Sequence, residues 1–399
     1  GIEDVELFGN DSNDEKVENC FVDQIIKPAY SMTTEAKFKF INQILFNEKK
    51  ETSQLSIVFN RFEQQKFMEK FTDGDDENGN KKALKTDNIS NKARPLFVQF
   101  MEQVDEDSIS LLKVHRDKPF SVDLVGENSI DSGGPAREIF SSLIVELMNN
   151  HIGVFTFNAN RRHNNKETNQ EDLIPNRQEM NDMNDRDENE VPDEISQFYS
   201  KRFIYAGALI AICIVSGLPQ PMKLSMIVWE YLTQEKVSIE SIYEIDNSFK
   251  ILMKTAEDLQ EKKLNEEEFE KVFLHAFEIN DSFDNVIELI PNGSKIRVTK
   301  ENLDEFIDLA KNKRLHEFDN ELKDLKDGFN RIMTHKNITK ILRPQELRLL
   351  VCGEPNCSVD QMKKLITVTP PLDSKISDEE MKKMFWNVMK SFSPEERML

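Results

Sequence analysis

The sequence is poor in cysteine, with four in 399 residues. Cys213 lies within an apolar run, which favours a buried thiol. Four residues separate Cys352 from Cys357, which is not the usual spacing of a zinc-binding pair, and no cluster of histidines accompanies them. Together with Cys20, these residues are typical of reduced thiols rather than of a disulfide framework. We therefore expect an intracellular protein, cytoplasmic or nuclear, that holds no metal and no cofactor.

The sequence also lacks an excess of positive charge and any long hydrophobic run. Its net charge is −21, which argues against nucleic acid or an anionic membrane as the main partner. The longest apolar run, Tyr205–Gly217, has 13 residues, whereas a membrane-spanning helix needs about 20. We interpret it as a buried helix and expect no membrane span. The acidic N-terminus has no signal-peptide pattern.

One short motif resembles the active-site sequence of a class of enzymes. Asp131–Pro135 reads Asp-Ser-Gly-Gly-Pro, like the surroundings of the nucleophilic serine in chymotrypsin-like proteases. Only His115 precedes Ser132 as a possible base, and Ile130 stands where those proteases have glycine. The residues after Pro135 have helical periodicity. We therefore predict a strand, a tight turn and a helix start, with an architectural role for the motif.

Two polar segments interrupt the chain. Residues 72–93 are predicted to be a linker, and their acidic start at Asp73 resembles a calcium-binding loop. However, Asn78 replaces glycine at position six and Leu84 replaces glutamate at position twelve, which favours a plain solvated loop. Residues 159–194 contain almost no apolar side chains, and we expect them to form a mobile excursion in which only the central Leu-Ile-Pro-Asn is held in place.

The second half of the chain has clearer patterns. Residues 238–312 are predicted to be a smaller unit with a β-hairpin whose turn is Pro291–Ser294. Ser377 and Glu380 form a capping box that predicts a helix start. One long helix is predicted from apolar residues that recur every three or four positions, namely Leu315, Phe318, Leu322, Leu325, Phe329 and Ile332.

Several segments, in order, resemble the HECT family of ubiquitin ligases over about residues 108–399. They are LLKVHRD with VDLVGENSIDSGGPAREIF, then NHIGVFTFN, LIPN, FYSKRFIYAGALIAICIVSG, NGSKIRVTKENLDEFIDL, LRPQELRLLVCGEP and FWNVMKSFSPEER. The resemblance implies a predominantly helical α+β fold, the N-terminal lobe of a HECT domain. It would consist of a large helical subdomain with a smaller α/β subdomain, including a hairpin, inserted at about 238–312. Residues 1–105 would be a helical extension.

In this family a ubiquitin-conjugating enzyme docks on the smaller subdomain, and ubiquitin passes to a ligase cysteine before it reaches a substrate lysine. The resemblance therefore implies ubiquitin, a conjugating enzyme and protein substrates as partners. The family's catalytic cysteine lies in a Thr-x-x-Cys context within a C-terminal lobe. None of the four cysteines has that context, so we expect no catalytic residue in this chain and no transfer by it alone. A non-catalytic interaction scaffold derived from such a lobe is the alternative.

The resemblance also implies a docking groove. Phe306 matches a key aromatic of the family's groove, and we expect it to be an exposed anchor. Ala310 stands where the family often has a larger residue. A looser match adds four further groove residues, Phe249, Leu252, Met253 and Phe273.

Overall fold

The structure is a computed structural model of the chain. It describes residues 29, 31–46, 55–72, 94–112, 116–127, 131–165, 169–177, 193–234, 236–262, 264–333, 336–354, 358–368 and 377–393. The polar linker, with its calcium-like start, and the second half of the 159–194 segment from residue 178 to 192 lie outside the described residues.

Most of the described elements are helices, with three two-stranded sheets, which confirms the predicted helical α+β class. The first part of the chain contains α2 (Thr34–Phe46), β1 (Ser56–Phe59), α3 (Arg61–Thr72), α4 (Leu96–Gln103), η3 (Asp107–Leu111), β2 (Ser121–Leu124) and α5 (Gly134–Leu147). The next part contains η4 (Asn150–Ile152), β3 (Phe155–Phe157), α6 (Ala159–Arg162), β4 (Leu173–Pro175), α8 (Asp193–Ser216), α9 (Met226–Gln234) and α10 (Ile239–Ile245).

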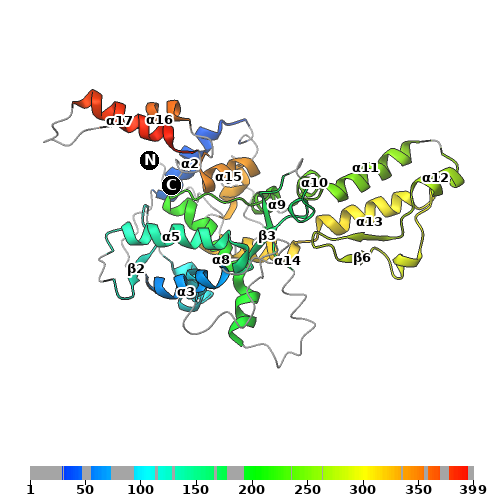
Figure 1. The fold of residues 1–399 in the computed structure, drawn as a ribbon, viewed down its shortest axis with the longest axis horizontal. Helices are drawn as coiled ribbons and strands as arrows, with labels where there is room; N and C mark the ends of the chain where they lie inside the picture. Colours follow the sequence, from blue (N-terminus) through cyan, green and yellow to red (C-terminus); the bar gives the residue numbers. More distant parts are fainter. Residues whose placement is uncertain are drawn as a thin grey trace, which may run out of the picture.

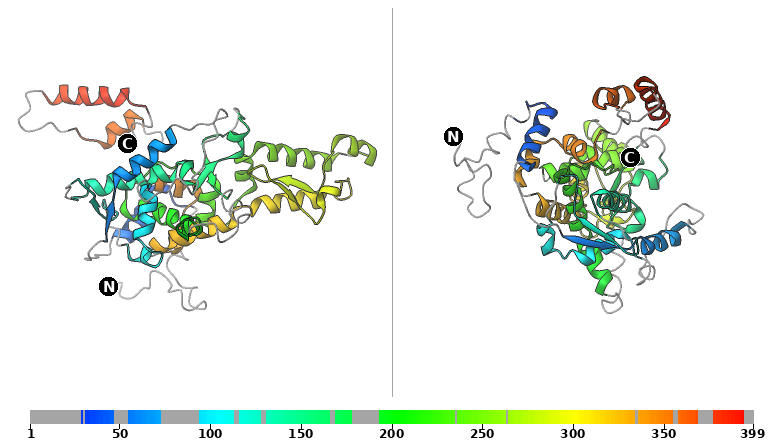
Figure 2. Two further views of the ribbon diagram at one scale, coloured as in Figure 1. Left: turned by 60° about the horizontal axis from the view of Figure 1, so that its bottom comes forward. Right: turned by 90° about the vertical axis from the view of Figure 1, so that its left-hand side faces the viewer.

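The remaining elements form a projection and then return. They are α11 (Asn247–Glu261), α12 (Glu266–Val272), β5 (Glu278–Asn280), β6 (Val286–Glu288), η5 (Gly293–Lys295), α13 (Leu303–Leu315), α14 (Asp319–Ile332), η6 (Lys336–Ile341), α15 (Pro344–Cys352), α16 (Val359–Leu365) and α17 (Asp378–Ser391). Ser377 caps α17 together with Glu380, as predicted. We call α2–α10, α14 and α15 the body, and residues 247–315 the projecting subdomain. Figure 1 shows this subdomain extending from one side of the body, and Figure 2 shows α16 and α17 at the other end.

Two helices with touching backbones form the centre of the body. From Phe203 to Ile214, α8 is buried on every side, because its residues there are apolar all round. It packs along α14, and a side-chain carbon added at Gly328 would lie 1.7 Å from the Ile204 carbonyl oxygen. One added at Gly207 would lie 1.8 Å from the Leu325 carbonyl oxygen. The two glycines therefore let each backbone rest against the other.

The predicted apolar stripe is buried except for the half-buried Leu315, but it does not lie on one helix. Leu322, Leu325, Phe329 and Ile332 all lie on the buried face of α14. The expectation of one helix beginning near Leu315 is wrong, because α13 ends there and the chain turns before α14 starts at Asp319.

The N-terminal part is not only helical, contrary to expectation. β1 pairs in parallel with β2 and buries alternate residues on the same face, among them Phe59 and Leu124. On its other edge, Gln103 accepts a hydrogen bond from the Val58 N–H at 2.9 Å and donates one to the Val58 carbonyl at 2.6 Å. Gln99, one turn earlier on α4, does the same to Asn60 at 2.8 and 3.2 Å. These side chains satisfy an open strand edge.

The protease-like run forms the predicted turn between β2 and α5. Asp131 accepts hydrogen bonds from the N–H groups of Val122 and Gly133, both at 2.9 Å, and pairs with Lys118 at 3.1 Å. Burial acts to raise the pKa of Asp131, but these partners hold it below its ordinary value. Gly133 has a φ of 102°, the left-handed conformation that glycine favours. The motif is architectural, and Ser132 is an exposed turn residue.

A buried ion pair attaches α2 to α15. The Lys37 Nζ atom lies 2.6 Å from Glu346 Oε2, and the Lys37 side chain is fully buried. Thr34 donates to the other oxygen of the same carboxylate at 2.9 Å. Because a buried ammonium without its partner is costly, this pair requires α2 and α15 to be present together.

Candidate functional site

The root of the projecting subdomain is a buried polar network centred on Arg314. Its guanidinium donates to Asp246, to Glu317 and to the Ser282 hydroxyl, each at 2.8 Å. Glu317 also accepts from the Ser282 N–H at 2.8 Å. Burial acts to lower the pKa of Arg314, but the two carboxylates raise it above its ordinary value. The network joins the two places where the chain enters and leaves the subdomain to the hairpin between them.

The hairpin lies earlier in the sequence than predicted. β5 and β6 pair in antiparallel fashion, with Ile279 opposite Ile287, and their turn is Asp281–Asn285. The Pro291–Ser294 segment, predicted to be the hairpin turn, instead overlaps η5, which begins at Gly293. The chain then returns beside the segment before β5, where the Phe277 N–H donates a hydrogen bond to the Ile296 carbonyl at 3.0 Å. Sequence reasoning recognised a turn correctly but assigned it to the wrong pair of strands.

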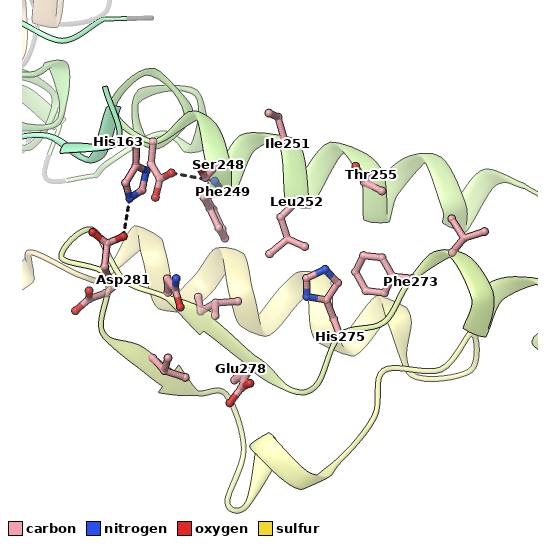
Figure 3. Close-up of a pocket in the computed structure, with 16 residues that line it drawn as sticks. His163, Ser248, Phe249, Ile251, Leu252, Thr255, Phe273, His275, Glu278 and Asp281 are labelled. Atoms are coloured by element: carbon pink, nitrogen blue, oxygen red, sulfur yellow. Dashed lines mark hydrogen bonds and ion pairs between the residues drawn. The ribbon is translucent and has the colours of Figure 1, made fainter. Parts of the chain in front are cut away.

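A pocket of about 460 Å³ lies between α11 and the segment that runs from the end of α12 into the hairpin. Figure 3 shows Leu252 pointing down from α11 toward the rings of Phe273 and His275. These two rings are 4.6 Å apart between centroids. At one end the pocket is apolar, and at the other it is lined by His163 and by carboxylates of the subdomain root. We call the apolar end, around Leu252 and Phe273, the groove.

The structure brings together only part of the predicted docking set. Phe249, Leu252 and Phe273 line the pocket. Phe306, Met253 and Ala310 do not line it, and each is fully buried in the subdomain core. The expectation that Phe306 is an exposed anchor is therefore wrong.

Phe306 instead supports the groove from behind. Its ring meets the ring of Phe273 edge to face at 5.9 Å and that of Phe277 at 5.8 Å. Such contacts favour a fixed ring orientation. Ala310 lies one helical turn further along α13 and is also fully buried, so its small size belongs to the packed core of the subdomain rather than to an open surface.

Sequence reasoning missed the exposed apolar residues beside the groove. Val272 is 60% exposed and Ile251 is 58% exposed, and both line the pocket. A signal existed on α11, because Ser248, Ile251, Leu252 and Thr255 recur at the spacing of one helix face. Exposed apolar residues next to a pocket are a feature of binding surfaces.

The subdomain around the groove is acidic. Residues 238–312 contain eighteen Asp and Glu against nine Lys and Arg, a net charge of −9. Hydrogen bonds from Lys254 and Lys311 lower the pKa of Glu257 on α11. Burial lowers the pKa of His275, which favours a neutral ring at physiological pH. The groove therefore offers an uncharged apolar floor within an acidic surface.

The two cysteines in the described part are poor nucleophiles. Burial raises the pKa of Cys213 well above its ordinary value and that of Cys352 to about 11. Cys20 and Cys357 lie outside the described residues. In the parts of the chain that the structure describes, no group of His, Cys, Asp and Glu side chains is arranged to hold a metal ion. No described helix is both long and apolar enough to cross a bilayer.

Comparison with known proteins identifies a family. A family model described as HECT-domain (ubiquitin-transferase) matches residues 141–399. Human E3 ubiquitin-protein ligase HERC2 is 27% identical over 292 residues, which are 73% of this chain and 5% of that protein. E3 ubiquitin-protein ligase ptr1 of Schizosaccharomyces pombe is 26% identical over 305 residues, which are 74% of this chain and 8% of that protein.

A third relative is similar over a shorter stretch. E3 ubiquitin-protein ligase Ufd4 of Drosophila melanogaster is 34% identical over 113 residues, which are 28% of this chain and 4% of that protein. The chain therefore spans less than a tenth of the length of these relatives. Because the family model covers well over half of it, the chain belongs to the HECT-domain family of ubiquitin transferases.

Proposed function

We propose that this chain is the part of a HECT-type ubiquitin ligase on which a ubiquitin-conjugating enzyme docks, and that the groove is the docking surface. The observation that carries the proposal is the groove itself: Leu252 and Phe273 on a rigid aromatic floor, with Val272 and Ile251 exposed beside it. Family membership supports the partner class, because ligases of this kind receive ubiquitin from a conjugating enzyme.

The arrangement suits a docking role energetically. Apolar side chains that are exposed in the free subdomain lose contact with water when a partner covers them, which contributes about 25 cal/mol per Å². The aromatic floor is already ordered, so docking immobilises few side chains. The contribution to ubiquitin transfer would then be one of proximity, in which the donor thioester is held close to its acceptor.

Val272→Asp is expected to weaken docking of a conjugating enzyme at least tenfold, because binding would bury the new carboxylate against apolar surface. Titration calorimetry against a panel of ubiquitin-conjugating enzymes measures the effect. The matched control is Val145→Asp on α5, since Val145 is 62% exposed and lies on the body. Both variants should melt close to the parent temperature. If no enzyme of the panel binds the parent chain, or if both variants bind equally well, the groove is not the docking surface.

We further propose that the chain does not itself accept ubiquitin as a thioester. The attacking species in such a transfer is the thiolate. Burial raises the pKa of Cys352 to about 11, so its thiol stays largely protonated at pH 7.5. Cys213 is 1% exposed and accordingly out of reach of a partner protein.

Incubation of the chain with activating enzyme, conjugating enzymes and ubiquitin is therefore expected to give no ubiquitin adduct that a reducing agent removes. Gels run with and without reductant measure this. A variant with Cys213→Ser and Cys352→Ser should behave like the parent. A reductant-sensitive adduct that disappears on Cys20→Ser or Cys357→Ser would show that an undescribed cysteine is the acceptor, contrary to the proposal.

A further inference from the structure

The projecting subdomain is joined covalently to the body at only two places. The chain enters at Asp246, which has an extended backbone between α10 and α11. It leaves between the end of α13 at Leu315 and the start of α14 at Asp319. Two connections define an axis, about which a rigid unit can still turn.

The buried network does not by itself prevent this rotation. Arg314 bonds Asp246 at the entry and Glu317 at the exit, and Ser282 of the hairpin bonds both Arg314 and Glu317, so all of these contacts lie close to the two connections. A turn about the axis that joins them changes such contacts little. Contacts away from the axis are needed to set the angle.

α6 of the body, together with His163 after it, contacts the chain both at the entry to the subdomain and at the hairpin, away from the axis. The Asn160 side chain donates to the Glu244 carbonyl at 2.8 Å and accepts from the Asn247 N–H at 2.7 Å, on either side of the entry. His163, directly after α6, lies 2.7 Å from the Asp284 carboxylate at the hairpin tip. The Arg162 guanidinium stands 4.9 Å above the Phe283 ring beside it. The helix therefore meets the subdomain at the entry and again at the hairpin.

The hairpin tip is shaped to present Asp284. The Asp281 carboxylate accepts from the N–H groups of Phe283 and Asn285 at 2.8 and 2.9 Å, which fixes the turn. Asp284 itself has a φ of 67°, a conformation that favours glycine or asparagine but that Asp and His also adopt. At this position Asp adds a carboxylate that reaches His163, which neither glycine nor a neutral amide would supply.

We propose that α6 and His163 form a bracket that sets the angle at which the projecting subdomain leaves the body, with His163 and Asp284 as positioning residues. The inference rests on the proposed function for its consequence: the bracket would fix where a docked conjugating enzyme stands relative to the body. The expectation of a mobile excursion is wrong for the described residues 159–165, because α6 lies there and Asn160 is buried. The exception made for Leu-Ile-Pro-Asn agrees with the structure, because β4 occupies Leu173–Pro175.

A charge-swap series tests the bracket by pulsed electron spin resonance. Spin labels at Val145→Cys on α5 and Lys295→Cys in η5 report the angle, since both positions are exposed. Serine replaces Cys20, Cys352 and Cys357 in this background, so that only the introduced thiols are labelled. The parent should give one narrow distance distribution. His163→Asp places two carboxylates opposite each other, and Asp284→His places two imidazoles there. Each single change should at least double the width of the distribution.

The double variant, His163→Asp with Asp284→His, should restore the narrow distribution, because the hydrogen bond between an imidazole and a carboxylate is re-formed with its partners exchanged. The control is His316→Asp, which breaks a second exposed His–Asp pair of the described residues, His316–Asp319, at 2.8 Å within the exit connection. It should leave the width unchanged. Single variants as narrow as the parent, no recovery in the double variant, or equal broadening by His316→Asp would each overturn the bracket. The measurement needs no conjugating enzyme, so its failure is distinct from failure of the docking proposal.

Discussion

Gly328→Ala is expected to cost the chain more than about 4 kcal/mol of folding free energy, which places it among the most damaging single changes. The new side-chain carbon would lie 1.7 Å from the Ile204 carbonyl oxygen and 2.5 Å from its carbon. These are backbone atoms of a helix, so no side-chain rotation relieves the clash. α8 and α14 would have to separate along their whole contact. Yield of soluble protein and thermal unfolding measure the loss.

Gly207→Ala on α8 is expected to have a similar effect, and combining it with Gly328→Ala tests the helix contact more sharply. Gly207→Ala meets the Leu325 carbonyl at 1.8 Å, and the separation of the helices that relieves one clash also relieves the other. The double variant should therefore cost clearly less than the sum of the two single variants. Gly134→Ala is the control, because nothing lies within 4 Å of a carbon added there. A Gly328→Ala chain that melts within a few degrees of the parent would rule out the close backbone contact.

Arg314→Leu is expected to destabilise the chain by about 3–5 kcal/mol, because it leaves the carboxylates of Asp246 and Glu317 buried without their cation. Denaturant unfolding measures the loss. Lys271→Leu is the control within the same subdomain. Its partner is Glu267, and the Lys271 side chain is 69% exposed, so the change should cost less than about 1 kcal/mol.

Neutralising the stranded carboxylates should recover part of the stability. Asp246→Asn keeps an acceptor for the Phe249 N–H, and Glu317→Gln keeps one for the Ser282 N–H. Added to Arg314→Leu, these two changes should restore more than half of the lost free energy, since the penalty arises from buried charge rather than from lost volume. A triple variant no more stable than Arg314→Leu alone would show that packing, not charge, dominates at this root.

The features predicted well from sequence are those fixed by local chemistry. The buried part of α8 followed from an apolar run, the turn before α5 from Gly133 and Pro135, and the start of α17 from Ser377 and Glu380. The parallel pairing of β1 with β2 was not predicted. The other edge of β1 bonds to the side chains of Gln99 and Gln103 on α4 instead of to a further strand, and no strand pattern in the sequence reveals such contacts. The position of the hairpin was not predicted either. Its turn, Asp281–Asn285, is held by hydrogen bonds to the Asp281 carboxylate, whereas the Pro-Asn-Gly-Ser run is the stronger turn signal in the sequence.

The candidate site was predicted only in part, for a related reason. Family resemblance pointed to residues of α11 and of the end of α12 that line the pocket, and to residues of α13 that do not, because it does not specify which side of a phenyl ring faces solvent. Phe306 lies behind Phe273 because α13 packs on the opposite side of the aromatic layer from the groove. Val272 was overlooked because a single valine at a helix end has no periodic signal. Exposure is a property of the packed subdomain as a whole.

The ion pair between Lys37 and Glu346 has a consequence for synthesis in the cell. The two residues are 309 positions apart in the chain. At about 5–20 residues per second, a ribosome adds Glu346 roughly 15–60 s after Lys37. During that interval α2 has been synthesised but α15, against which it packs, has not. The apolar face of α2 and the ammonium group of Lys37 therefore remain open to other contacts. We expect nascent chains that stop short of α15 to be held by chaperones or degraded, because α2, the first helix of the body, can pack in place only when α15, its last helix, has been made.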